Sequence, residues 1–130
     1  DFVIHRADGL FAYQLAVVVD DAFQGVTQVV RGADLLDSTS RQICLQKALG
    51  YTTPGYMHLP VALSADGKKL GKRFKADPVL NQDPAFAVAQ ALHFLGQSPP
   101  KNCSLEVLWD WALENWNSKL VPHQRAIYPT

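Results

Sequence analysis

The sequence predicts an α/β fold followed by a small helical segment, and two observations support this prediction. Over the first 65 residues, short β-branched runs alternate with stretches of helical character, as in an α/β layer with parallel strands. From Asp77 onward the chain consists of helix-forming stretches separated by prolines. The 130 residues suit one modest domain, and 48% hydrophobic with 18% charged residues indicate a globular chain. We therefore divide it into residues 1–76 and 77–130.

The first elements follow from local patterns. Residues 2–6 predict a short strand, and the Asp-Gly pair within residues 7–9 predicts a turn. The apolar stretch 10–23 is too long for one strand and rich in alanine and leucine at its start. We therefore expect a buried helix there, ended by Gly25. Residues 26–31 are β-branched and bounded by glycines, which predicts the clearest strand of the chain.

A second helix and a further strand complete the α/β part. Residues 37–49 predict a helix that ends at Gly50, and residues 37–39, Asp-Ser-Thr, are candidates for its N-cap. Residues 56–63 predict another strand. In open α/β sheets ligands bind beyond the carboxyl ends of strands, so the segments after these strands are candidate binding sites.

A basic loop, Asp66 to Arg73, contains four cationic side chains within six residues, together with two glycines. Lysines and glycines suit a polyphosphate, because the charges can follow it and the backbone can approach it. An ordinary solvated turn is the alternative. A P-loop does not fit, because three residues instead of four separate Gly67 from Gly71, and Arg73 replaces the magnesium-binding Ser or Thr. Since Arg31 also follows a strand, we expect Arg31 and this loop to form an anion site.

The second part predicts helices and a loose end. Residues 85–95 predict a helix ended by Gly96, and residues 104–116 predict another. The three tryptophans of the latter helix are expected to fill the core and its grooves, and not to stack on bases. From Lys119 onward we expect a loose tail.

Composition narrows the classes of function. Twelve basic and twelve acidic residues cancel, so any nucleotide or nucleic-acid site must be a local basic patch. Cys44, Cys103 and four scattered histidines lack metal-ligand spacing, so we expect no zinc site and reduced thiols in the cytoplasm. No apolar run approaches the ~18 residues of a membrane span.

Asp20 and Asp21 would point apart on a helix, which argues against paired-carboxylate catalysis. Because the chain begins with Asp1 and not methionine, we expect a processed or excised piece.

Six blocks, in this order, resemble the class I glutamyl-tRNA synthetase family. They are Asp1-Phe2-Val3-Ile4-His5-Arg6 with Asp8-Gly9, Tyr13-Gln14-Leu15-Ala16-Val17-Val18-Val19-Asp20-Asp21, Val29-Val30-Arg31-Gly32-Ala33-Asp34, Arg41-Gln42, His58-Leu59-Pro60 and Lys69-Leu70-Gly71-Lys72-Arg73. The last block resembles the class I signature Lys-Met-Ser-Lys-Ser. The chain is more similar to the short glutamyl-Q tRNA(Asp) synthetase branch, because Ala33 stands where full-length glutamyl-tRNA synthetases usually have Glu and only a small helical segment follows.

The resemblance implies a fold, a reaction and partners. Residues 1–76 would be the C-terminal half of a Rossmann-like, nucleotide-binding catalytic domain. The branch activates glutamate with ATP and Mg²⁺ and transfers it to the queuosine of tRNA(Asp). Forming glutamyl-adenylate and pyrophosphate requires charge stabilisation more than a base. Lys69 and Lys72 match the signature lysines and are the expected catalytic and ATP-binding residues, with Lys72 on the phosphates.

Four further residues match the family's binding sites. His58 and Leu59 match the segment that lies against the adenine of ATP. Tyr13 and Arg31 match residues of the glutamate pocket, where the planar fork of an arginine suits a carboxylate. Three of these residues have a simpler alternative: Tyr13 as a buried aromatic, Arg31 in a structural ion pair, and His58 as a satisfied, partly buried histidine.

Two departures from the family qualify this interpretation. Gly71 replaces the signature serine, which removes a hydroxyl donor worth ~1 kcal/mol of phosphate binding and loosens the loop. The family's N-terminal His-containing signature and the branch's zinc-binding cysteines are absent, so we expect this chain alone to be inactive. A discriminating glutamyl-tRNA synthetase and a non-catalytic nucleotide- or tRNA-binding fragment remain alternatives. The oligomeric state stays open, and an exposed sheet edge would favour a dimer.

Overall fold

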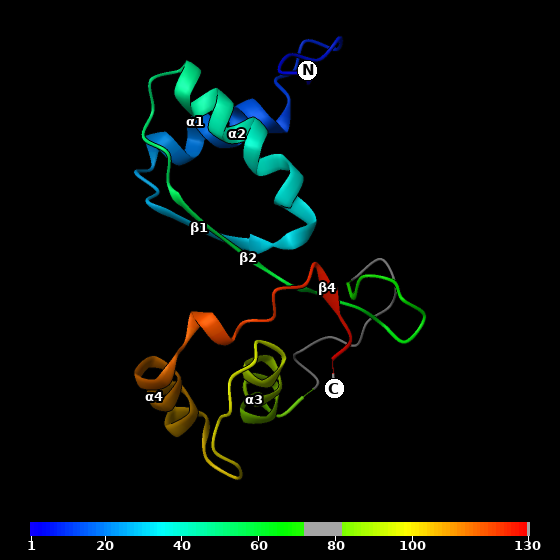
Figure 1. Ribbon diagram of the computed structural model, residues 1–130, viewed down its shortest axis with the longest axis vertical. Helices are drawn as coiled ribbons and strands as arrows, with labels where there is room; N and C mark the ends of the chain where they lie inside the picture. The colour runs from blue at the N-terminus through cyan, green and yellow to red at the C-terminus, as the bar shows by residue number, and fades with distance from the viewer. Residues whose placement is uncertain (72–81, 130) are drawn as a thin grey trace. The chain divides into compact units, whose positions relative to one another are not determined.

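The computed structural model describes residues 1–71 and 82–129, and the chain forms two compact units, Asp1–His58 and Leu59–Thr130 (Figure 1). Helices and strands mix in both units, which confirms the predicted α/β class.

The first unit packs two helices together beside a pair of strands. In chain order it contains α1 (Tyr13–Phe23), β1 (Gln28–Gly32), a 3₁₀ turn η1 (Ala33–Leu35), α2 (Leu36–Ala48) and β2 (Gly55–Leu59). The two strands are neighbours in one sheet, and α1 packs against α2 (Figure 1). Val18 and Ala33 are buried, and so are two glutamines of α2, Gln42 and Gln46. The interior of this unit is therefore partly polar.

The start of the chain differs from the prediction of a strand over residues 2–6. Only an isolated antiparallel bridge forms, between His5 and Phe11, around the predicted turn. Since the Ala12 amide donates to the Ile4 carbonyl in this hairpin, α1 begins at Tyr13 instead of residue 10.

The N-cap prediction for α2 was wrong. The helix follows directly from η1, its N-cap is Leu35, and no side chain caps it. The predicted cap candidates include Ser38 and Thr39, whose hydroxyls instead bond side chains of other elements. A 3₁₀ turn before a helix leaves no role for a capping hydroxyl in its first turn.

The ends of α1, α2 and α3 were predicted correctly, and one motif explains all three. Gly25, Gly50 and Gly96 follow the C-caps with positive φ angles of 70°, 72° and 76°. After α3, for example, the Gly96 amide donates to His93 O at 2.9 Å and the Gln97 amide to Leu92 O at 2.9 Å. This pair of bonds is the Schellman motif, which requires a left-handed residue.

The second unit contains β3 (Val61–Ala62), α3 (Pro84–Phe94), α4 (Leu105–Asn115), a 3₁₀ turn η4 (Ser118–Leu120) and β4 (Ala126–Ile127). Its core lies between α3 and α4 and centres on Leu92, Leu108 and Ala112. The side chains of Asp83 and Ser104 cap these helices, accepting from Phe86 N at 2.9 Å and Val107 N at 3.4 Å. Both helices were predicted.

Two predictions for this region need correction. The strand predicted over residues 56–63 is interrupted at Pro60, which has no amide hydrogen to donate to a ladder. The tail beyond Lys119 is not loose: it forms η4, buries Val121 and pairs β4 in parallel with β3. A two-residue strand whose partner is distant in sequence leaves no periodic signal.

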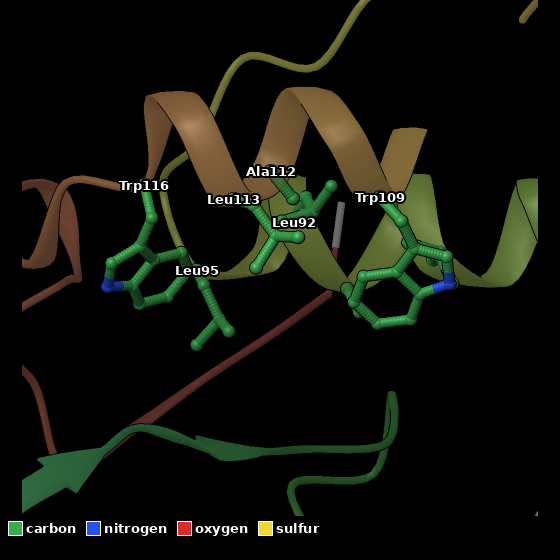
Figure 2. A pocket seen from close by; sticks show the side chains of 8 residues that line it. Leu92, Leu95, Trp109, Ala112, Leu113 and Trp116 are labelled. Atoms are coloured by element: carbon green, nitrogen blue, oxygen red, sulfur yellow. The ribbon is translucent and has the colours of Figure 1, made fainter. Parts of the chain in front are cut away.

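An apolar pocket of about 500 Å³ lies between α3 and α4 (Figure 2). Trp111 packs against the core as predicted. Trp109 and Trp116 instead line the pocket and remain 52% and 42% exposed, with the 82% exposed Leu113 beside them. Trp109 and Trp116 therefore lie at opposite ends of this pocket and do not fill it (Figure 2).

Candidate functional site

Arg31 is the centre of a hydrogen-bonded network in the first unit. It lies near the end of β1 and is half-buried. Its Nη1 donates to Gln42 Oε1 at 2.7 Å, and its Nη2 donates to Thr39 Oγ1 at 2.8 Å and to the Leu35 carbonyl at 3.3 Å. Its Nε donates to His58 Nε2 at 3.4 Å. Four of the five N–H groups of the guanidinium thus donate a hydrogen bond to an acceptor within the first unit.

Two aromatic rings of β2 support the same guanidinium. Tyr56 and His58 are two positions apart and therefore share a face of the strand. Their rings are stacked, with centroids 6.2 Å apart. The Arg31 carbon Cζ lies 5.2 Å from the Tyr56 ring centroid, which is a cation–π contact. The guanidinium is consequently fixed along its edge and over one face.

The hydrogen bonds of His58 favour its neutral form. Thr39 Oγ1 accepts from Arg31, so its own hydrogen is available for His58 Nε2, 2.9 Å away. With Nε2 accepting, the imidazole is neutral. Burial, and secondly the charge of Arg31, lower the pKa of His58. His58 thus has the environment of a satisfied, partly buried histidine, and its contact with adenine stays a prediction.

The charge of Arg31 is not neutralised within the described chain. No carboxylate in residues 1–71 or 82–129 forms an ion pair with it, and every hydrogen-bond partner found there is uncharged. The ion-pair alternative is therefore wrong for this part of the chain. One Nη1 hydrogen has no acceptor among these residues. The site can offer an anion a fixed positive charge and one direct N–H, which is less than the two-pronged contact expected from the sequence.

Tyr13 lies at the start of α1 and is 54% exposed, so the buried-aromatic alternative is wrong. The next residue, Gln14, belongs to the network. Gln14 Oε1 accepts from Gln42 Nε2 at 2.9 Å, and Gln14 Nε2 donates to Ser38 Oγ at 3.0 Å. The structure thereby connects the start of α1 to Arg31. The role of Tyr13 in binding glutamate stays a prediction.

The described part of the basic loop is a hairpin. Leu63 and Lys69 form an antiparallel bridge, and Ser64 N donates to Lys68 O at 2.8 Å. Lys68 also pairs with Asp66 at 2.8 Å, and hydrogen bonds from Lys68 and from Ser64 lower the pKa of Asp66. Lys69 is exposed.

Leu59 and Lys72 are the remaining residues expected to bind ATP. Leu59 is half-buried at the end of β2. Lys72 lies outside the described residues. The anion site expected to be formed jointly by Arg31 and the basic loop stays a prediction.

Sequence reasoning missed the two buried glutamines of α2, one of which, Gln42, is a partner of Arg31. The sequence predicted a helix over residues 37–49 without indicating which side chains are buried, and in the structure these are Gln42 and Gln46, 1% and 2% exposed. Gln46 Nε2 donates to the Tyr56 hydroxyl at 2.9 Å. Two glutamines four residues apart share one helical face, and this spacing was the available signal.

The described residues contain neither a metal-binding cluster nor a membrane-spanning helix. No three His, Cys, Asp or Glu side chains in residues 1–71 and 82–129 could together hold a metal ion. No helix in the same residues has the length and hydropathy needed to cross a membrane.

Sequence comparison identifies relatives of this chain. Residues 1–105 match the family described as tRNA synthetases class I (E and Q), catalytic domain. A glutamyl-Q tRNA(Asp) synthetase of Chromobacterium violaceum is 55% identical over 123 residues, covering 94% of this chain and 41% of the relative. Another, of Aromatoleum aromaticum, is 56% identical over 127 residues, covering 95% of this chain and 40% of the relative. The chain thus spans about two-fifths of the length of these relatives.

Structure comparison agrees on the fold. A glutamate tRNA ligase from Elizabethkingia meningosepticum matches with a TM-score of 0.66 at 24% identity, over 98% of this chain and 29% of that one. The glutamate-tRNA synthetase from Elizabethkingia anophelis matches with a TM-score of 0.64 at 25% identity, over 93% and 29%. The expected class I catalytic-domain fold is confirmed. The matched family, the close relatives and the shared fold lead to one conclusion: this chain belongs to the class I (E and Q) tRNA synthetase family.

Proposed function

We propose that this chain carries part of the site of a ligase that activates glutamate with ATP and transfers it to the queuosine of tRNA(Asp). The observation that carries this proposal is Arg31, a half-buried guanidinium held by uncharged partners near the end of a strand. Such a site attracts a carboxylate, and strand ends are where α/β sheets bind ligands. The names of the 55% and 56% identical relatives supply the tRNA and the reaction class.

The chemistry assigns a role to each expected residue. A carboxylate oxygen of glutamate attacks the α-phosphorus of ATP, the bond to the departing pyrophosphate breaks, and glutamyl-adenylate forms. A hydroxyl of queuosine then attacks the acyl carbon, and AMP leaves. Arg31 binds a substrate carboxylate beside Tyr13, and Lys69 and Lys72 stabilise phosphate charge. His58 and Leu59 border the adenine.

Class I synthetases use ATP, generally with Mg²⁺. The described residues contain no group of three potential protein ligands, so phosphate oxygens and water would supply most of the coordination. Mg²⁺ commonly binds nucleotides in this way. We place the reaction in the cytoplasm, where tRNA and ATP occur together.

The test is glutamate-dependent exchange of pyrophosphate into ATP. Two proteins are compared: this 130-residue chain, and the C. violaceum relative in which this chain replaces the matching 123 residues. The unaltered relative is the positive control. Transfer is then measured with tRNA(Asp) containing queuosine, tRNA(Asp) lacking it, and tRNA(Glu).

We expect the hybrid to catalyse exchange, the chain alone to be inactive, and transfer to require queuosine. Transfer to tRNA(Glu) would instead support a discriminating glutamyl-tRNA synthetase. An inactive hybrid beside an active relative would contradict the proposal and favour a non-catalytic binding fragment. Exchange by the chain alone would contradict the assignment of only part of the site to it.

A further inference from the structure

Gln42 occupies the middle of a one-way chain of hydrogen bonds. Its Oε1 accepts from Arg31 Nη1 at 2.7 Å, and its Nε2 donates to Gln14 Oε1 at 2.9 Å. Gln14 Nε2 donates in turn to Ser38 Oγ at 3.0 Å. Gln42 itself is 1% exposed. The contact joins α2 to both β1 and the start of α1.

The chemistry of arginine fixes the direction of this chain. A guanidinium has donors only, so the Gln42 atom that faces Arg31 must be the amide oxygen. The amide nitrogen of Gln42 then faces Gln14, whose facing atom must be its own oxygen. Each amide orientation thus follows from the charge at one end.

A glutamine at this position holds Arg31 without neutralising it. A carboxylate of equal length would accept the same hydrogen bond and would also cancel the charge. An aliphatic side chain would preserve the charge but release Nη1. Among the common side chains of this length, the neutral amide both fixes the guanidinium and keeps its charge available.

We propose that Gln42 is a positioning residue that orients Arg31 and preserves its charge for a substrate carboxylate. This inference rests on the glutamate-binding role proposed above for Arg31. Thr39 and His58 restrain the other edge of the guanidinium, so Gln42 fixes the nitrogen that carries its unused hydrogen.

Three variants of the hybrid enzyme separate positioning from structural support. Gln42→Glu keeps the acceptor and adds a charge, whereas Gln42→Met removes both hydrogen bonds at similar volume. Gln46→Met is the matched control, because Gln46 lies one turn further along α2, is 2% exposed and bonds Tyr56 instead of Arg31. Pyrophosphate exchange gives KM for glutamate, KM for ATP and kcat, and thermal unfolding of the 130-residue chain gives stability.

We expect Gln42→Glu to raise KM for glutamate at least tenfold, with KM for ATP within twofold of the original and no loss of thermal stability. Gln42→Met should raise KM for glutamate less and lower the unfolding temperature. Gln46→Met should lower the unfolding temperature while KM for glutamate stays within twofold. An unchanged KM for glutamate in Gln42→Glu would overturn the inference, as would equal kinetic effects of Gln42→Glu and Gln46→Met.

A second readout does not depend on turnover. In the 130-residue chain, the Nη1–H resonance of Arg31 that is bonded to Gln42 should exchange slowly with water and should shift when glutamate is added. It should exchange faster in Gln42→Met, and in Gln42→Glu it should stay slow but no longer respond to glutamate. Absence of pyrophosphate exchange in the hybrid together with absence of a glutamate shift in the 130-residue chain would refute the proposed function. Equal Nη1–H exchange in the original chain and in Gln42→Met would refute positioning by Gln42.

Discussion

Gly96 provides the sharpest test of how the second unit is held together. It follows α3 with φ 76°, and a Cβ added there would lie 2.1 Å from the Leu120 carbonyl oxygen. That distance is far below the 3.0 Å that real Cβ atoms keep, and the obstructing atom belongs to the backbone. Replacement of Gly96 by alanine therefore adds a steric conflict to a conformational one.

The expected loss of stability for Gly96→Ala is the sum of two effects. A left-handed conformation costs an L-residue about 1–2 kcal/mol. Forcing the Leu120 segment away adds about 1–3 kcal/mol, the usual range for overpacking. The total of about 2–5 kcal/mol is a large part of the roughly 5–15 kcal/mol that stabilises a typical domain.

Gly67→Ala is the matched control in the same unit. Gly67 has φ 78°, but its added Cβ would meet only the Tyr128 hydroxyl at 3.6 Å, an ordinary contact. We expect this variant to lose only the conformational part, about 1–2 kcal/mol. The difference between the two variants isolates the conflict with Leu120.

Urea unfolding followed by tryptophan fluorescence measures both variants. All three tryptophans lie between residues 109 and 116, so the signal reports the second unit. The slope of free energy against urea should stay constant while the midpoint falls. Equal losses for the two variants would refute the steric argument, and a loss below about 1 kcal/mol for Gly96→Ala would refute the conformational argument too.

Three further predictions concern the site. Arg31→Lys should lower the stability of the first unit by about 1–3 kcal/mol, measured by circular dichroism, because lysine cannot donate to Gln42 and to the Leu35 carbonyl together. The same variant should raise KM for glutamate at least tenfold in the hybrid. The pKa of His58 is lowered below its usual 6.5, so its contribution to stability should be complete above about pH 6.5 and be lost as the pH falls toward its pKa in the folded chain. His58→Gln should therefore reduce the dependence of the unfolding temperature on pH between pH 7.5 and 5.5. An unchanged dependence would contradict the neutral imidazole. Lys69→Ala should lower pyrophosphate exchange about tenfold, equivalent to about 1.4 kcal/mol of transition-state stabilisation. Lys68→Ala should have little effect, because Lys68 pairs with Asp66. Equal losses in the two variants would show that only the net positive charge of the loop matters, and not the position of Lys69.

Local signals predicted the helices well. Glycines that end helices act through a few neighbouring backbone bonds, and capping side chains such as Asp83 and Ser104 act over one turn. The N-cap prediction at residues 37–39 was wrong because a 3₁₀ turn directly precedes α2 and no side chain caps the helix. Information within one or two turns of the chain is therefore largely readable from the sequence.

Long-range arrangements were less predictable. The sequence placed Arg31 near a strand end, which the structure confirms, but its partners come from α2 and β2. Buried glutamines are uncommon and carry no apolar periodicity, so Gln42 was not expected in the interior. Only the tertiary structure shows that a buried polar side chain is satisfied by a charge on another element.

The parallel pairing of β3 with β4 sets an order of folding during synthesis. The helices of the first unit and the β1–β2 pair all lie within residues 1–59, so they can form while the ribosome is still extending the chain. The sheet of the second unit joins residues 61–62 to residues 126–127 and must wait until the latter emerge. The chain between β3 and β4 is nearly three times as long as that between β1 and β2, which adds about 1 kcal/mol of loop-closure entropy. Until then the α3–α4 pair, with its open tryptophan-lined pocket, presents apolar surface to chaperones and to aggregation.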